Sequence, residues 1–289
     1  MPITLSRFVR DAVSRLSGCY PPEEAKSIVS ALCCHILGVR QYTYITEPDF
    51  VIDATVAASL EEAMSRLLDM EPVQYVIGRS SFYGMSLRVC PSVLIPRPET
   101  EELCRLAIDS FKGVSGLRVL DLCTGSGCIA WAMSANLPRS KVFGCDISMP
   151  ALEVACSQSV DAPSPVFFRF DLLEGLSSLG ACFPLTDKFD LILSNPPYVT
   201  GSEKSSMSRN VLDYEPGTAL FVPDDDPLVF YRAISCMASR QLKQGGTGIV
   251  EINERFGTEC LVLFEDAGFN DCEIIKDLNG KDRFCRFVL

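Results

Sequence analysis

The segment that decides the fold class of this chain is Leu117-Arg-Val-Leu-Asp-Leu122, followed directly by Cys123-Thr-Gly-Ser-Gly127. The first six residues are typical of a buried strand, and the apolar residues after the loop predict a helix. A strand that turns over glycines into a helix leaves backbone N–H groups exposed, and a ligand can approach where a Cβ would obstruct it. We therefore expect a nucleotide-type ligand to contact the loop residues Cys123, Thr124, Gly125, Ser126 and Gly127.

Downstream of this loop, strands and helices alternate, which predicts an α/β fold with a parallel sheet covered by helices on both faces. The last two strands are separated only by a short polar turn, so we expect them to form an antiparallel pair at the end of the sheet. The expected strands span residues 117–122, 141–146, 166–170, 189–194, 248–252, 272–276 and 284–288, and the expected helices span about 127–136, 150–159, 227–242 and 256–267.

Upstream of the loop the pattern is different. Apolar residues at helical spacing within residues 1–70 predict three helices and hence a small all-α domain. Residues 81–90 predict a β-hairpin that turns near Gly84-Met85, after which three prolines stiffen the connection. The expected organisation is an N-terminal helical domain at 1–78, a hairpin and linker at 79–98, and an α/β domain at 99–289.

Composition restricts the function classes. The 289 residues include 26 Lys+Arg and 37 Asp+Glu, a formal net charge of −11, which disfavours nucleic-acid binding because phosphate contacts need a basic surface. No signal-peptide core and no apolar run long enough to span a membrane is visible, so we expect a cytoplasmic protein. The 14 cysteines form no C-x-x-C pair and the single histidine is distant from most of them, so no metal site is expected.

Two acidic residues follow the second and third expected strands. Asp146 ends the second strand, where a carboxylate can accept hydrogen bonds from ribose hydroxyls. Asp171 follows the third strand and could meet an adenine amino group, although a simple turn residue explains it nearly as well. The run from Gly125 to Ala130 also fits the G-x-G-x-x-A dinucleotide fingerprint, so a dehydrogenase or a catalytically silent nucleotide-binding module stays open.

A second motif, Asn195-Pro196-Pro197-Tyr198, follows the fourth expected strand directly. Ligands of open α/β sheets bind beyond the carboxyl ends of the strands, so this tetrapeptide should lie near the glycine loop. The two prolines fix the backbone and lack N–H groups, which leaves carbonyl groups free to accept hydrogen bonds. The Asn195 side chain and the Pro196 carbonyl can then hold both hydrogens of a planar –NH2 group, and Tyr198 offers it a flat face.

These residue types suit methylation of an amide or amine nitrogen. A carboxamide nitrogen is a poor nucleophile because its lone pair is delocalised into the carbonyl group. Acceptors that hold both hydrogens favour a localised lone pair as the new bond forms, and alignment with a methyl donor adds a proximity effect. The catalytic candidates are therefore Asn195, Pro196 and Tyr198, and no general base is required.

The chain resembles the HemK/PrmC family of protein-(glutamine-N5) methyltransferases, which methylate the glutamine of the Gly-Gly-Gln tripeptide in peptide chain release factors. Most of residues 71–289 take part in this resemblance, whereas the N-terminal region is similar only in size, pattern and position. The matching motifs are Glu71-Pro-Val-Gln-Tyr-Val-Ile-Gly78, Leu94-Ile-Pro-Arg-Pro-Glu-Thr-Glu101, Asp121-Leu-Cys-Thr-Gly-Ser-Gly127, Ser194-Asn-Pro-Pro-Tyr198, Tyr214-Glu-Pro-Gly-Thr-Ala-Leu220 and Asp277-Leu-Asn-Gly-Lys-Asp-Arg283.

The resemblance implies a seven-stranded, Rossmann-like class I methyltransferase fold that uses S-adenosyl-L-methionine. It implies that the segment from Ile95 to Glu101 passes over the active site, and that the N-terminal helices and the hairpin contact the release factor. The residues implied around the cofactor are Cys123, Thr124, Gly125, Ser126, Gly127, Asp146, Asp171, Leu172 and Asn195, and those implied around the target glutamine are Asn195, Pro196, Pro197 and Tyr198.

Three departures from the family pattern concern loops. Cys123 stands where the family usually has glycine, which implies a different backbone angle or a modest loss of cofactor contact. The sequence Pro223-Asp-Asp-Asp-Pro-Leu228 replaces a glycine-rich segment, and Glu251-Ile-Asn253 stands where Glu-Ile-Gly is usual. None of these positions lies within Asn-Pro-Pro-Tyr.

Other substrates remain open. A glutamine of a ribosomal protein would present the same amide group to the motif. An exocyclic amine of a nucleic-acid base would also suit an Asn-Pro-Pro-aromatic motif, but the net charge of −11 counts against it. A dehydrogenase would use the glycine loop and leave Asn-Pro-Pro-Tyr without a role.

Overall fold

The computed structural model describes residues 3–175 and 187–289, and the chain forms two compact units. The first contains the chain as far as Arg79 together with Ser208–Tyr214, and the second contains Ser80–Met207 and Glu215–Leu289. The hairpin and the proline-rich segment, which the sequence set apart as a connector, therefore group with the sheet-containing unit.

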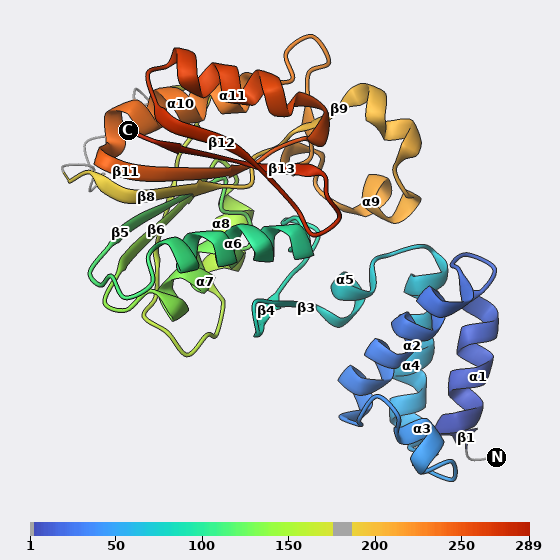
Figure 1. Ribbon diagram of the computed structural model, residues 1–289. Helices are drawn as coiled ribbons and strands as arrows, with labels where there is room; N and C mark the ends of the chain where they lie inside the picture. The colour runs from blue at the N-terminus through green and yellow to red at the C-terminus, as the bar shows by residue number, and fades with distance from the viewer. Residues whose placement is uncertain (1–2, 176–186) are drawn as a thin grey trace. The chain divides into compact units, whose positions relative to one another are not determined.

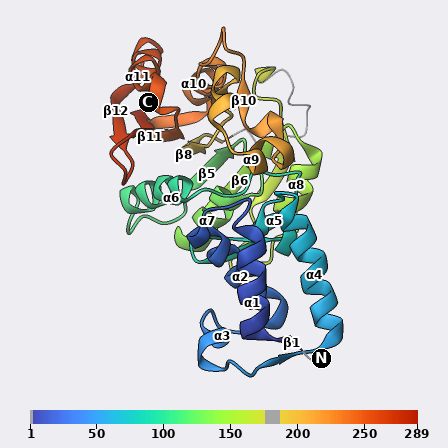
Figure 2. The same ribbon diagram turned by 90° about the vertical axis from the view of Figure 1, so that its right-hand side faces the viewer.

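The first unit is built on the three predicted helices, α1 (Leu5–Leu16), α2 (Pro22–Leu37) and α4 (Ala54–Leu68), which lie side by side (Figure 2). Their apolar faces share one core, which includes Phe8, Leu32 and Met64. Several short elements were not predicted: an antiparallel pair of β1 (Ile3–Thr4) and β2 (Val51–Ile52), and the helices α3 (Thr43–Thr46), α5 (Val73–Ile77) and α9 (Arg209–Tyr214).

The second unit contains a seven-stranded sheet in the order β12-β13-β11-β8-β5-β6-β7 (Figure 1). Strands β7, β6, β5, β8 and β11 run parallel, while β13 is antiparallel to both β11 and β12, so the predicted sheet and its antiparallel end are confirmed. The strands are β5 (Arg118–Leu122), β6 (Lys141–Asp146), β7 (Val166–Arg169), β8 (Phe189–Ser194), β11 (Leu242–Glu251), β12 (Asn270–Lys276) and β13 (Asp282–Val288).

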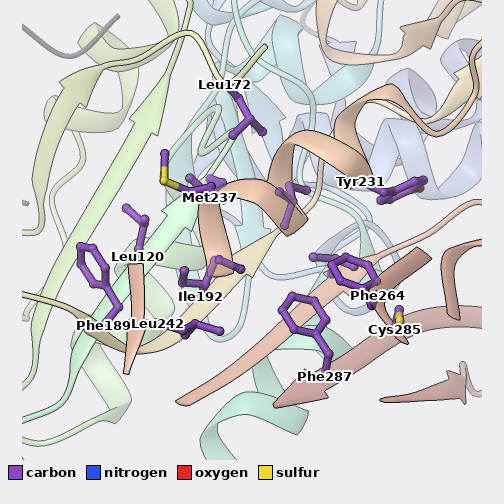
Figure 3. Packing of buried hydrophobic residues seen from close by; sticks show 14 of the residues in the cluster. Leu120, Leu172, Phe189, Ile192, Tyr231, Met237, Leu242, Phe264, Cys285 and Phe287 are labelled. Carbon is purple, nitrogen blue, oxygen red and sulfur yellow. The ribbon is translucent and has the colours of Figure 1, made fainter. Parts of the chain in front are cut away.

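Each face of the sheet has its own helices and its own core (Figure 1). Because side chains alternate along a strand, Leu120 of β5 packs toward α10 and α11, whereas its neighbour Val119 packs toward α6 and α7. Figure 3 shows Leu120 and Ile192 beside Met237 in the first of these cores. The helices are α6 (Pro98–Ser110), α7 (Cys128–Asn136), α8 (Met149–Cys156), α10 (Val229–Gln241) and α11 (Gly257–Asp266).

Helix α6 was not predicted, because Pro98 was interpreted as part of a stiff linker. Proline is favoured in the first turn of a helix, where its missing N–H group would have no partner in any case. Here Pro98 begins α6, and the carboxylates of Glu99 and Glu101 in the first turn suit the positive end of the helix dipole.

The predicted hairpin is present as β3 (Arg79–Phe82) and β4 (Met85–Arg88). Its two turn residues are Tyr83 and Gly84, which have φ values of 47° and 76°. Positive φ at both central residues is what a tight hairpin turn of two residues commonly requires. Two further short strands, β9 (Val199–Thr200) and β10 (Phe221–Val222), pair in parallel outside the main sheet.

None of the described helices combines the length and the hydropathy that a membrane span needs.

Gly248 of β11 lies opposite Phe287 of β13, and the phenylalanine ring covers the glycine. A Cβ at position 248 would lie 2.1 Å from that buried ring. We expect Gly248→Ala to lower the free energy of unfolding by about 1–3 kcal/mol, since an overpacked core must shift. Urea denaturation would measure the loss.

Gly217→Ala provides the control for this prediction, because its added Cβ would lie 3.6 Å from the nearest atom, an ordinary contact distance. Equal stability of the two variants would contradict the packing argument.

Candidate active site

A cleft lies at the carboxyl ends of the parallel strands, where the sequence placed the ligand. The predicted residues that line it are Cys123, Thr124, Gly125, Ser126, Asp146, Asp171, Leu172, Asn195 and Pro197. Gly127, Pro196 and Tyr198 are not among the lining residues. Further lining residues come from the proline-rich segment and the first turn of α6, and from the region before α10 and its start, including Pro96, Arg97, Thr100, Pro216, Thr218 and Phe230.

The glycine loop is hydrogen-bonded to Asp146 at the end of β6. The backbone N–H of Gly125 donates to Asp146 Oδ2 over 2.9 Å, and that of Ser148 donates to Oδ1 over 2.9 Å. Asp146 therefore joins the loop to the start of α8, which the Ser148 side chain caps as the sequence suggested. Burial raises the pKa of Asp146, although the two backbone donors oppose that shift.

Gly127 ends the loop in a tightly packed position and does not line the cleft. Its φ of 80° lies in the left-handed region, and an added Cβ would lie 3.0 Å from both Ala155 and Phe167. Cys123 also has a positive φ, 58°, a conformation that glycine adopts without strain. The cysteine thus occupies a backbone conformation that suits the glycine which the resemblance predicts at this position.

Asp121 lies buried beneath the loop. Its Oδ2 atom accepts a hydrogen bond of 2.5 Å from the Thr124 hydroxyl and one of 3.2 Å from the backbone N–H of Ala130 in α7. Burial raises the pKa of this carboxyl group to about 7, and the two hydrogen bonds oppose that shift. Asp121 belongs to one of the motifs that carry the resemblance, but no separate role was predicted for it.

Asp171 forms a turn as well as lining the cleft. Its Oδ1 atom accepts hydrogen bonds from the backbone N–H groups of Leu173, over 2.9 Å, and Glu174, over 3.3 Å. The alternative interpretation as a strand-end turn residue therefore describes what this side chain does in the structure, and an adenine contact stays a prediction.

Asn195 lines the cleft, and the nitrogen of its side-chain amide is held by a hydrogen bond. Its Nδ2 atom donates to the Thr100 hydroxyl over 2.9 Å, and that hydroxyl donates to Glu251 Oε2 over 2.8 Å. The Tyr198 hydroxyl donates to the other oxygen of the same carboxylate, also over 2.8 Å. The ring of Tyr198 packs against the core on the α10 side, and its expected stacking on a substrate stays a prediction.

The proline-rich segment is held beside the cleft by a buried carboxylate. Glu215 Oε1 accepts from the Arg97 guanidinium over 2.5 Å, and Oε2 accepts from the backbone N–H of Ile95 over 3.1 Å. The Glu215 side chain is 1% exposed and that of Arg97 is 31% exposed, so the carboxylate is shielded from solvent while its partner is partly accessible. The ion pair joins the segment before α6 to the residue that precedes Pro216–Ala219, a region that also lines the cleft.

Asn253, one of the three departures, also makes contacts that the sequence did not indicate. Its Nδ2 atom donates to the backbone carbonyl of Tyr198 over 3.1 Å and to Glu203 Oε2 over 3.0 Å. Glu203 in turn accepts from the backbone N–H of Thr200 over 2.9 Å. In the 223–228 segment, Asp224 accepts from the backbone N–H of Ser202 over 3.0 Å, so both departures support the chain that follows Tyr198.

Sequence reasoning did not assign roles to Thr100, Glu215, Glu251 or Asn253. Glu251 and Asn253 follow the apolar strand segment Gly248-Ile-Val250, and polar residues at the carboxyl end of a parallel strand are a usable signal. Thr100 and Glu215 lie within two of the motifs that carry the resemblance. These motifs do not indicate which residues Thr100 and Glu215 contact.

Comparison with known proteins decides the family. Residues 8–78 match the model of the PrmC N-terminal domain, and residues 104–213 match that of the methyltransferase small domain. A release factor glutamine methyltransferase from Bacteroides thetaiotaomicron is 41% identical over 96% of this chain and 97% of its own length. The chain belongs to the release factor glutamine methyltransferase family.

Another curated relative and a solved structure are also similar to this chain. The release factor glutamine methyltransferase of Flavobacterium psychrophilum is 34% identical over 95% of both chains. A solved structure of a protein-(glutamine-N5) methyltransferase from Alicyclobacillus acidocaldarius covers 70% of this chain and 98% of that chain, with 26% identity and a TM-score of 0.45.

The raised pKa of Asp121 predicts a pH effect on stability. The folded state binds this proton more tightly than the unfolded chain does, so the associated stabilisation is complete below pH ~4 and is lost as the pH rises through about 7. We expect the free energy of unfolding of Asp121→Asn to decline less than that of the unaltered protein across this range. Urea denaturation at several pH values would measure both profiles.

Asp146 and Glu251 are present in both proteins, so their own shifts cancel in the difference between the two profiles. Parallel profiles would show that Asp121 does not titrate in this range.

Proposed function

We propose that this protein transfers a methyl group from S-adenosyl-L-methionine to the side-chain amide nitrogen of the glutamine in the Gly-Gly-Gln motif of peptide chain release factors. The observation that carries the proposal is the position of Asn195. Its side chain lines the same cleft as the glycine loop, and its Nδ2 atom is bonded to Thr100, so its oxygen remains as an acceptor for the target amide. Relatives that cover nearly the whole chain are named for this reaction.

The residues of the cleft fit the nucleoside part of the methyl donor. Asp146 already accepts two backbone hydrogen bonds, and a carboxylate has further lone pairs that ribose hydroxyls can use. Apolar side chains beside it, Ile147, Ala151 and Leu172, can cover an adenine ring, with Asp171 at its edge. When bound, the cofactor supplies an electrophilic methyl group.

The chain's own contribution to the chemistry is to hold the nucleophile. The Asn195 oxygen and the Pro196 carbonyl accept the two hydrogens of the glutamine amide and keep its nitrogen directed at the methyl group. As the new C–N bond forms and the bond between the methyl carbon and the donor sulfur breaks, positive charge develops on this nitrogen, and the same two acceptors stabilise it. One proton then passes from the methylated nitrogen, which is strongly acidic at that stage, to solvent water, so no base with a shifted pKa is needed.

The first unit and the hairpin are proposed to bind the body of the release factor. The support is the match of residues 8–78 to a domain model that belongs to this family, since a second domain offers contact area that the cleft lacks. On this proposal the helical part spans residues 1–78, the hairpin and linker span 79–98, and residues 99–289 carry the chemistry.

Transfer of labelled methyl groups tests the substrate. The protein would be incubated with radiolabelled S-adenosyl-L-methionine and, separately, with a release factor, with its Gln→Ala Gly-Gly-Gln variant, with a glutamine-bearing ribosomal protein and with duplex DNA. We expect label on the unaltered release factor alone. Label on the DNA or on the ribosomal protein, and none on the release factor, would replace this proposal by one of the two alternatives.

The amide clamp makes Asn195 essential for turnover. We expect Asn195→Ala to lower kcat by at least about 100-fold, the effect of removing one acceptor that stabilises developing charge. The thermal midpoint should change little, because the side chain lies at a strand end and is only half-buried. Methyl-transfer kinetics and thermal unfolding of the same preparation would be compared, and turnover like that of the unaltered enzyme would refute the clamp.

Asp146 predicts how cofactor binding depends on pH. Ribose hydroxyls donate to the ionised carboxylate, whose pKa is raised by burial, so affinity should decrease as the pH falls through that raised value. Calorimetric titration with S-adenosyl-L-homocysteine between about pH 8 and pH 5 would measure this trend. Asp146→Asn, which cannot ionise, should bind more weakly and show a smaller dependence on pH. An equal dependence in both proteins would assign the effect to another group.

A further inference from the structure

A chain of three side chains leads from the cleft into the protein interior. Asn195 lines the cleft, Thr100 lies in the first turn of α6, and Glu251 lies at the end of β11. Thr100 is 2% exposed and Glu251 is 1% exposed, so solvent does not compete for their hydrogen bonds. Buried hydrogen bonds of this kind are costly to break, because an unsatisfied partner remains.

The direction of each hydrogen bond in this chain follows from the carboxylate. Glu251 accepts from Tyr198 at Oε1 and from Thr100 at Oε2, which is the pattern of an ionised group with no proton to give. The Thr100 hydroxyl has one hydrogen, and it is committed to Glu251. Toward Asn195 the hydroxyl can therefore only accept, and the side of the amide that meets it must be the –NH2 side.

The consequence for Asn195 is a fixed amide polarity. An asparagine side chain can turn by half a rotation at little steric cost, and the turn exchanges its oxygen and nitrogen. With the oxygen toward the cleft, the side chain accepts from a target –NH2 group. With the nitrogen toward the cleft, two donors would face each other and the clamp would not close.

Burial raises the pKa of Glu251, and the like charge of Glu99 adds to that shift. Three neighbours oppose it and favour the ionised form, namely the hydroxyls of Thr100 and Tyr198 and the positive charge of Arg283. Arg283 is itself held in place by Asp277, whose Oδ2 accepts from its Nε over 3.1 Å.

We infer that Thr100 and Glu251 are positioning residues that set the amide polarity of Asn195, so that its oxygen and not its nitrogen faces the substrate. The inference rests on the proposed function, because polarity matters only if the cleft binds a hydrogen-bond donor such as a carboxamide. Neither residue needs to touch the reacting atoms.

A matched pair of variants tests this inference. Thr100→Val keeps the shape of the side chain and removes the hydroxyl, whereas Thr100→Ser keeps the hydroxyl. We expect Thr100→Val to lower kcat by about tenfold or more, corresponding to one lost orienting hydrogen bond, with KM and the Kd for S-adenosyl-L-homocysteine changed less than about threefold. Thr100→Ser should retain kcat within about threefold of the unaltered enzyme.

Two kinetic outcomes would overturn the inference. One is an unchanged kcat in Thr100→Val. The other is a loss in which kcat, cofactor affinity and thermal stability decline together in both variants, which is the result of a purely structural role. If Thr100→Val does not fold, Thr100→Ala takes its place, with the same expectation and the same contradicting outcomes.

A measurement without substrate separates this inference from the proposed function. The side-chain NH2 resonances of Asn195, assigned by their loss in Asn195→Asp, should exchange slowly with solvent in the unaltered protein and faster in Thr100→Val. Slow exchange in both would overturn the inference even if release factors are methylated. Conversely, an unaltered protein that methylates no release factor would refute the proposed function while the exchange experiment still tests the orientation of Asn195.

Discussion

The parallel pairing of β5 with β8 is the constraint on which the site depends. Leu122, the last residue of β5, lies opposite Ser194, the last residue of β8, and the Ser194 hydroxyl donates to the Leu122 carbonyl over 2.8 Å. The residues that follow these two strands are the glycine loop and Asn-Pro-Pro-Tyr. One register therefore brings the two motifs to the same edge of the sheet, although more than 60 residues separate them in the chain.

The central strands could be predicted because β5, β6 and β8 are short apolar runs whose side chains are mostly buried. Four of the seven sheet strands deviate from prediction by no more than one residue at either end, among them β6 and β8. β11 begins at Leu242 rather than near 248, because the polar and glycine-rich residues 242–247 join the ladder through an irregular register that no hydrophobic pattern reveals. α6 was missed because a proline can end one element or begin another.

The site residues that could be predicted are those that belong to a recognisable motif and also suit a definite chemical role. The glycine loop, Asp146 and Asn195 follow strand ends, so their convergence comes from topology alone. The contacts that fix these residues are long-range: Thr100 and Glu251 are 151 residues apart, and Arg97 and Glu215 are 118 apart. Single hydrogen bonds over such separations leave no periodic trace in a sequence. The departure at Asn253 likewise could be seen as a difference, but its bonds to Tyr198 and Glu203 could not.

Asp146 accepts hydrogen bonds from Gly125 and Ser148, which lie on two different segments of the cleft wall, and Glu215 accepts from Ile95 and Arg97 of the segment before α6. A loop that is ordered only on binding would lose conformational entropy at that step, and the affinity would decrease accordingly. In this fold that entropy loss belongs to folding, because the two carboxylates join the glycine loop to α8 and the segment before α6 to Glu215. The cleft is thus preorganised, and more of the interaction energy of an incoming nucleoside remains available as affinity.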